Sequence, residues 1–241
     1  MPMIAEATTA RATRRRAISN GTNFWHTTYL GANRYRPDPA GPPAPGTIYP
    51  MAFLVEQDAR EIVRPHFHQA DQFQVVVAGD GTLGTHPVRA VSVHFTGAFS
   101  AYGPIVAGES GLSYFTLRNG WDPGARYMPG ARAELPRPRA HREAVGAVES
   151  GDEVQDVIAA AADGMGATRH VLAPGARLAG PDPAEGGGQY WVVLTGGLDR
   201  DGGALGAGSC AFVAPDEAAW APVAGPAGAE ILVLRFPRRP G

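Results

Sequence analysis

The second half of this chain repeats the first half at a constant spacing of 117 residues. When residues 53–118 are aligned with residues 170–235, 16 of the 66 positions are identical. The identities keep one register, as in Gln72 with Gln189, Gly79 with Gly196, and Leu117-Arg118 with Leu234-Arg235. A gapless alignment of this kind predicts two versions of one folding unit, each of about 100 residues.

The composition limits the chemistry. The chain has 32 glycines and 22 prolines, which favours many short strands joined by tight turns. All 21 basic residues are arginine, so Schiff-base chemistry and a lysine-held pyridoxal cofactor are excluded, because both need an ε-amine. Cys210 is the single cysteine, which excludes an internal disulfide, and we expect it to be buried and inert. A net charge of −2 gives no reason to expect nucleic acid or a membrane surface as a partner.

Strand and turn signals divide the chain into four parts. Residues 1–20 are predicted to form a disordered or extended tail, because no apolar stretch follows their arginines. Residues 21–120 form a first β unit, with Gly79-Asp80-Gly81 as a turn between two strands. Residues 121–165 are predicted to be a Pro- and Arg-rich linker that ends in one short helix, since a capping box at Ser150–Glu153 precedes Val154, Val157 and Ile158 at helical spacing. Residues 166–241 form the second β unit.

Only the first copy carries two histidines at close spacing. Arg64-Pro65-His66-Phe67-His68 takes the place of Pro181-Asp182-Pro183-Ala184-Glu185 in the second copy. On a strand, His66 and His68 point to the same face, where two imidazoles can share one metal ion. The spacing alone is weak evidence, because such pairs also occur by chance.

The surroundings of the pair resemble the cupin superfamily. His66-Phe67-His68, three residues, Gln72, six residues and Gly79 are similar to the first cupin motif, in which a glutamate stands where Gln72 stands. The second copy keeps typical cupin surroundings at Pro174-Gly175-Ala176, Ala207-Gly208-Ser209 and Phe212-Val213-Ala214-Pro215. The resemblance covers both repeats. It implies an all-β fold of two tandem double-stranded β-helix barrels (cupin jelly rolls), of which the second is degenerate.

Three positions depart from the family pattern. The carboxylate ligand is replaced by Gln72, the opening glycine by Arg60, and the histidine of the second motif by Tyr102 or, in the second copy, by Ala219. The metal ligands that the resemblance implies are therefore His66 and His68, with Gln72 or His94 as further candidates. Gln72 is equally well explained as an amide that holds strands together, because Gln189 stands in a copy without the pair. Tyr102 is a catalytic acid or hydrogen-bond donor, or a packing residue, and His94 is also explained as an ordinary core histidine.

Arginines supply candidate substrate contacts. If residues 63–68 are extended, Arg64 shares the face of the two histidines and can hold a carboxylate; Arg60 is a second candidate. Arg118 and Arg235 end the last strand of each copy, and we expect them to tie strand to loop.

The leading hypothesis is a metal-dependent enzyme, of the dioxygenase or oxidoreductase type, that acts on a small organic acid with one divalent ion (Fe, Mn, Ni or Zn) in the first barrel. The rival is a non-catalytic module that binds a small ligand or regulates another protein. We expect a soluble cytoplasmic protein with a small-molecule substrate or ligand, without nucleic acid or membrane partners, and the sequence leaves a homodimer open.

Overall fold

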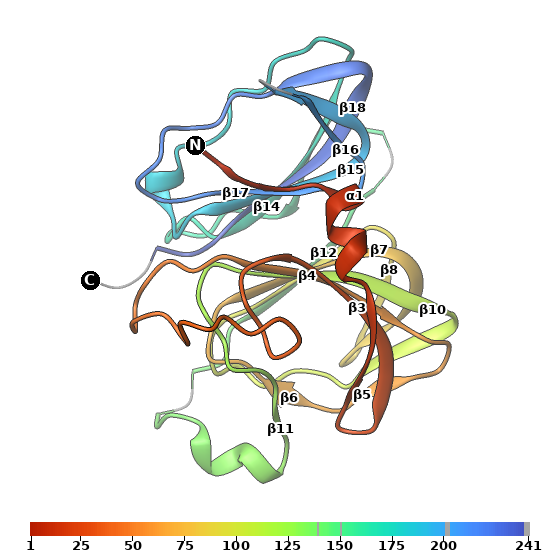
Figure 1. Cartoon of the computed structure of the whole chain (residues 1–241), viewed down its shortest axis with the longest axis vertical. Helices are drawn as coiled ribbons and strands as arrows, with labels where there is room; N and C mark the ends of the chain where they lie inside the picture. Colours follow the sequence, from red (N-terminus) through yellow and green to blue (C-terminus); the bar gives the residue numbers. More distant parts are fainter. Residues whose placement is uncertain (139, 150, 201–202, 239–241) are drawn as a thin grey trace. The chain divides into compact units, whose positions relative to one another are not determined.

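A computed structural model describes residues 1–138, 140–149, 151–200 and 203–238 of the chain. The chain divides into two compact units (Figure 1). We call residues 13–147 the N-terminal barrel, and residues 1–12 together with 148–241 the C-terminal barrel. Both are built from antiparallel strands, as the sequence predicts.

The N-terminal barrel is a nine-stranded sheet with a small two-stranded sheet beside it. The main path runs β12-β9-β7-β10-β4-β3-β2, with β5 beside β10 and β8 beside β7, while β6 pairs with β11. The strands are β2 (Arg15–Ser19), β3 (Thr22–Leu30), β4 (Met51–Gln57), β5 (Ile62–Val63), β6 (His66–Phe67), β7 (Gln72–Leu83), β8 (His86–Arg89), β9 (Ser92–Thr96), β10 (Ile105–Arg118), β11 (Arg126–Tyr127) and β12 (Glu143–Ala147). A 3-10 helix, η2, spans Gly130–Glu134.

The C-terminal barrel is a seven-stranded sheet in the order β1-β17-β15-β18-β14-β13, with β16 beside β15. Its elements are β1 (Met3–Ala5), α1 (Ala7–Ala10), η1 (Arg11–Thr13), β13 (Val154–Ile158), β14 (Gly166–Leu172), η3 (Pro183–Glu185), β15 (Gln189–Arg200), β16 (Gly203–Gly206), β17 (Cys210–Val213) and β18 (Val223–Arg235). Its core contains the fully buried Trp191, which packs with Val193, Ile231 and Val233. Cys210 is buried in this barrel, and burial raises the pKa of its thiol to about 12.

The repeat is visible in the strand pairing, with one shift that the gapless alignment missed. Gln72 pairs with Arg118 and Gln189 pairs with Arg235, so these strands match at the spacing of 117. On the other side of the last strand, however, Arg118 pairs with Met51 and Arg235 pairs with Gly166, a spacing of 115. The second copy therefore has two more residues between its β14 and β15 than the first has between β4 and β7.

The predicted turn at Gly79-Asp80-Gly81 lies inside a strand. β7 continues to Leu83, and its pairing with β10 shifts register around Gly79. Gly79 has a φ of +76°, and a Cβ there would lie 2.1 Å from the carbonyl oxygen of Gly111. Gly196, one repeat later, has a φ of +67° and faces Gly228 in the same way. The glycines allow the two strands to approach closely where the sheet kinks.

The predicted tail does not hold for residues 1–20. β1 pairs with the edge strand β17, Ile4 packs on the apolar core of the C-terminal barrel, and the N–H of Ala7 donates to Oγ of Ser209 at 3.0 Å. Residues 15–19 form β2 against β3. Long-range pairing to an open sheet edge orders a segment whose own composition gives no signal.

The predicted helix after Glu153 is a strand instead. β13 pairs with β14, and a register shift between Asp156 and Ile158 brings the neighbours Val157 and Ile158 both to the buried side. Val154, which a helix would bury with them, is 59% exposed. A bulged strand of β-branched residues thus imitates helical spacing. Ser150 of the predicted capping box lies outside the described residues.

The predicted linker belongs largely to the N-terminal barrel. β11 pairs with β6 and β12 pairs with β9, so these two strands belong to the barrel and do not separate two domains. In the described part of the chain no helix is long and apolar enough to cross a membrane.

Replacing Gly79 by Ala is expected to lower the free energy of unfolding by about 2 kcal/mol or more, because the side chain meets both a positive φ and a backbone oxygen. Gly206→Ala is the matched control, since no atom lies within 4 Å of its Cβ position; its effect should stay within about 0.5 kcal/mol. Urea unfolding of both variants measures the difference. Equal, small effects would show that the kink tolerates a side chain.

Candidate functional site

A cavity of about 110 Å³ lies inside the N-terminal barrel. Its wall combines aromatic rings with buried polar groups. The lining includes Phe24, His26, Tyr35, Phe53, Tyr114 and Tyr127 among the rings, and His66, His68, Gln72, Gln74, Tyr102, Thr116, Arg118 and Asp122 among the polar groups.

The histidine pair is held at this cavity by the backbone pairing of β6 with Tyr102. The backbones of His66 and Tyr102 exchange two hydrogen bonds, of 3.1 and 3.0 Å, which place the two side chains next to each other. Phe67 points away and is fully buried. The rings of His66 and His68 both line the cavity, with their centroids 5.1 Å apart.

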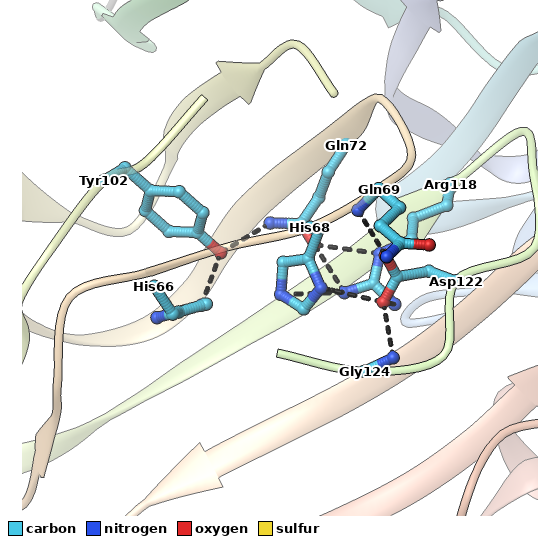
Figure 2. Close-up of polar contacts among 8 residues, drawn as sticks. All are labelled: His66, His68, Gln69, Gln72, Tyr102, Arg118, Asp122 and Gly124. Atoms are coloured by element: carbon cyan, nitrogen blue, oxygen red, sulfur yellow. Dashed lines mark hydrogen bonds and ion pairs between the residues drawn. The ribbon is translucent and has the colours of Figure 1, made fainter. Parts of the chain in front are cut away.

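The protons of His66 and Tyr102 follow from their partners (Figure 2). Burial, with the nearby charge of His68, lowers the pKa of His66 to about 3, so its ring is neutral at physiological pH. Nδ1 lies 2.8 Å from the carbonyl oxygen of Arg64, which can only accept, so Nδ1 carries the hydrogen. Nε2 therefore accepts from the Tyr102 hydroxyl at 2.9 Å.

Tyr102 is held as a neutral phenol. Its oxygen accepts a hydrogen bond of 2.7 Å from Nε2 of Gln72 while its hydrogen goes to His66. Burial raises the pKa of Tyr102 above its ordinary value, so the side chain in this arrangement is a neutral phenol near neutral pH. The residue acts as a hydrogen-bond donor at this site.

Gln72 and Arg118 close the network on its other side. The amide oxygen of Gln72 accepts from Nε of Arg118 at 3.0 Å and from Nη2 at 2.7 Å. Nη2 also lies 3.1 Å from both ring nitrogens of His68, so the guanidinium faces that ring. In this arrangement Gln72 connects an arginine to a tyrosine.

Asp122 balances the buried charge of Arg118. Its Oδ1 lies 3.3 Å from Nη1 of Arg118 and 2.8 Å from Nδ1 of His68, and the N–H groups of Gln69 and Gly124 donate to the carboxylate at 2.7 and 2.8 Å. Burial alone would raise the pKa of Asp122, but Arg118, His68 and these hydrogen bonds hold it well below its ordinary value. Arg118 does tie the end of β10 to the following loop, as predicted, and it also brings a cation into the cavity.

The side chains as arranged do not fit a divalent metal ion. An ion bound about 2.1 Å from a nitrogen of His68 would lie within about 5 Å of Nη2 of Arg118. At that distance the guanidinium and a metal ion would repel each other, because both are cations. The negative charge of Asp122 already balances Arg118, Nε2 of His66 is bonded to Tyr102, and the oxygen of Gln72 is bonded to Arg118. Among the described residues, no three His, Cys, Asp or Glu side chains are grouped to hold a metal.

His94 is a core histidine outside the cavity wall. It lies on β9, where Nδ1 is 3.0 Å from Oε1 of Gln74 and Nε2 is 2.9 Å from Oε1 of Glu143. Both nitrogens therefore have partners, and the ring braces β9 against β7 and β12.

The two arginines predicted to bind substrate lie elsewhere. Arg60 has a φ of +64°, and its exposed guanidinium pairs with Glu109. Its backbone thus adopts the left-handed conformation that glycine favours, and Gly175 adopts it in the second copy with a φ of +72°. Arg64 is exposed as well, because the bend between β5 and β6 breaks the expected alternation, and only its carbonyl serves the site.

Sequence reasoning missed Asp122 and His26. Asp122 lies in a Pro- and Gly-rich segment that resembles a linker, although it stands four residues after Arg118, and that spacing was an available signal. His26 lies on β3, inside an ordinary strand pattern without a motif.

The C-terminal barrel lacks the polar network at the equivalent positions. Trp191 stands where Gln74 stands and is buried in an apolar cluster, and Ala219 replaces Tyr102. Gln189 keeps the amide of Gln72, but it donates to the carbonyl of Pro181 at 3.0 Å, and its oxygen has no partner among the described residues.

Changing Tyr102 to Phe should lower the free energy of unfolding by about 1–3 kcal/mol, because Nε2 of Gln72 and Nε2 of His66 each lose their hydrogen-bond partner. Tyr114→Phe is the matched control: Tyr114 is buried in the same cavity, and its hydroxyl bonds to no described residue. Its effect should stay within about 0.5 kcal/mol. Thermal and urea unfolding compare the two, and similar losses would argue against the assigned network.

No protein-family model matches the sequence, and neither does any curated protein. Solved structures do match in fold. The bacterial pirin YhhW from Escherichia coli, solved in complex with nickel(II), aligns with a TM-score of 0.60 and 15% identity over 99% of this chain and 100% of its own. A Nostoc punctiforme protein provisionally described as a dioxygenase aligns with a TM-score of 0.63 and 13% identity over 99% of this chain and 83% of its own. Oxalate decarboxylase from Lactobacillus farciminis, solved as a formate complex, aligns with a TM-score of 0.58 and 12% identity over 94% of this chain and 85% of its own.

These matches span nearly the whole chain, but their sequence identities are so low that they show only a shared fold. They agree with the two antiparallel barrels and with the repeat in the strand pairing. The chain has the bicupin fold, with a polar cavity in its first barrel and an apolar cluster around Trp191 in its second.

Proposed function

We propose that the N-terminal barrel binds a small organic molecule without the help of a metal ion. The observation that carries this proposal is the position of Arg118, whose guanidinium lies where two cupin-type histidines and Gln72 would otherwise face a metal. A permanent cation there supplies a fixed positive charge, and Asp122 keeps the interior close to neutral.

The cavity is suited to a ligand because its walls are already ordered. The polar groups form a continuous series of hydrogen bonds from Arg118 through Gln72 and Tyr102 to His66. The aromatic rings around them provide apolar area. Pre-organised concave sites of mixed apolar and polar lining are typical of small-molecule binding.

A metal-dependent oxidoreductase that acts on an organic acid is the second candidate. Two observations favour it: His66 and His68 line one cavity, and structures of the same fold include a nickel-bound pirin and an oxalate decarboxylase. It requires Arg118 to leave the ring of His68, which would also separate the guanidinium from Asp122.

Equilibrium dialysis against Mn(II), Fe(II), Ni(II) and Zn(II), followed by elemental analysis, separates the two candidates. We expect the purified protein to bind far less than one ion per chain, and binding to be the same in His66→Ala/His68→Ala. The double variant His86→Ala/His141→Ala, at exposed histidines, controls for ions held at the surface. Near-stoichiometric metal that is lost only with His66 and His68 would reject the metal-free proposal in favour of the oxidoreductase.

The ligand itself is tested on protein treated with a chelator. Benzamide, a neutral one-ring probe, should raise the melting temperature in a concentration-dependent manner, as a ligand of the native state does. The absence of any shift at millimolar benzamide would count against a ligand site in this barrel.

A further inference from the structure

His26 is a buried polar side chain whose hydrogen bonding is incomplete. The residue is 1% exposed and lines the cavity, with its ring stacked on Phe53 at 4.9 Å and beside Tyr35 at 4.6 Å between ring centroids. Nδ1 is buried and has no hydrogen-bond partner. Buried polar atoms are rarely left in this state, because the loss is substantial. A bound group that exchanges a hydrogen bond with His26 accounts for it.

Arg34 brings an unbalanced positive charge to the same cavity. It is the exposed arginine of the cavity wall, on the turn that pairs Asn33 with Arg36. Its Nη2 donates to the carbonyl of Ile18 at 3.3 Å and to the Tyr35 hydroxyl, and its guanidinium lies over the Tyr35 ring. No carboxylate in the described part of the chain forms an ion pair with it, whereas Arg118 deeper in the cavity is paired with Asp122.

The turn that carries Arg34 is held in place. Oδ1 of Asn33 accepts from the N–H groups of Tyr35 and Arg36 at 2.8 and 3.1 Å, and Nδ2 donates to Oγ1 of Thr28 at 3.1 Å. Nη1 of Arg15 donates to the carbonyl of Tyr35 at 2.7 Å. The guanidinium of Arg34, which has no ion pair among the described residues, is therefore attached to an ordered backbone. This reduces the entropy that is lost when it binds an anion.

The electrostatic field at His26 agrees with an excess of positive charge. Burial, followed by the charges of Arg34, Arg15 and Arg118, lowers the pKa of His26 to about 4. The ring is therefore neutral at physiological pH and offers one N–H donor and one acceptor.

The size of the cavity limits the rest of the ligand. At about 110 Å³ it is of the same order as an engineered protein cavity of about 150 Å³ that holds benzene. The neutral, aromatic-lined interior accepts an apolar body, and the cationic side at Arg34 accepts an anionic end.

We propose that the N-terminal barrel binds a one-ring carboxylic acid, whose carboxylate is held by the guanidinium of Arg34 and the imidazole of His26 while its ring lies in the aromatic part of the cavity. This inference rests on the proposed metal-free binding function and names its ligand class. It moves acid recognition from Arg60 and Arg64, where the sequence placed it, to the segment that includes β3 and the turn after it.

Calorimetric titration of chelator-treated protein with benzoate and benzamide tests the inference, because the two probes share a ring and differ in charge. Benzoate should bind about 10-fold more tightly or better, as expected for a charge-assisted contact with arginine. Arg34→Gln should bring the two affinities close together while benzamide affinity stays the same. His26→Phe, which keeps the stacked ring, should weaken benzoate binding more than benzamide binding.

Arg36→Gln is the matched control, since Arg36 is exposed on the same turn and its side chain lies outside the cavity wall; both affinities should be unchanged. If benzamide binds but benzoate has no advantage, or if the advantage survives in Arg34→Gln, the acid assignment is overturned and metal-free ligand binding stands. If neither probe binds, the ligand-binding function fails together with the inference.

Discussion

The interior of the N-terminal barrel depends on a buried ion pair between Arg118 and Asp122. A guanidinium that is 3% exposed is stable only if its charge is balanced and its N–H groups are bonded. Asp122 balances the charge, and Gln72 accepts two of the donors. The remaining contacts follow from these: the amide of Gln72 is fixed so that it donates to Tyr102, and Tyr102 in turn donates to His66. The histidine pair therefore belongs to a hydrogen-bond network centred on an arginine.

The two barrels show how one strand framework accepts different interiors. The kink glycines occur at equivalent places in both copies, because each pair of strands approaches closely at the same point. Arg118 and Arg235 also occupy equivalent places, but the residue four positions later is Asp122 in the first copy and Arg239 in the second. The second copy instead packs Trp191 with apolar neighbours in its interior.

Much of the fold could be predicted from the sequence, because local strand and turn patterns and the internal repeat indicate most of the strands. The strands around residues 51–57, 72–78, 92–96 and 112–118 contain β-branched and aromatic residues, and each has a counterpart in the second copy. Two segments were misread for a physical reason. The pairing of β1 with β17 joins residues more than 200 positions apart, and the bulge in β13 mimics helical spacing. Neither can be recognised in a local window.

The site could be predicted only in part. Counting through the motif brought His66, His68, Gln72 and Tyr102 together, and the four side chains do lie in one cluster (Figure 2). Which atoms face one another was not predictable. The role of Gln72 depends on Arg118, the role of Arg118 depends on Asp122 in a supposed linker, and His26 reaches the cavity from a strand without a motif.

The central claim is that Arg118, rather than a metal ion, supplies the positive charge beside His66 and His68. Crystals soaked in Mn(II) or Ni(II) and measured at the metal absorption edge test it most directly. We expect the guanidinium of Arg118 against the ring of His68 and no anomalous density between the two histidines. An anomalous peak about 2.0–2.3 Å from nitrogens of both rings, with Arg118 turned away, would contradict the account.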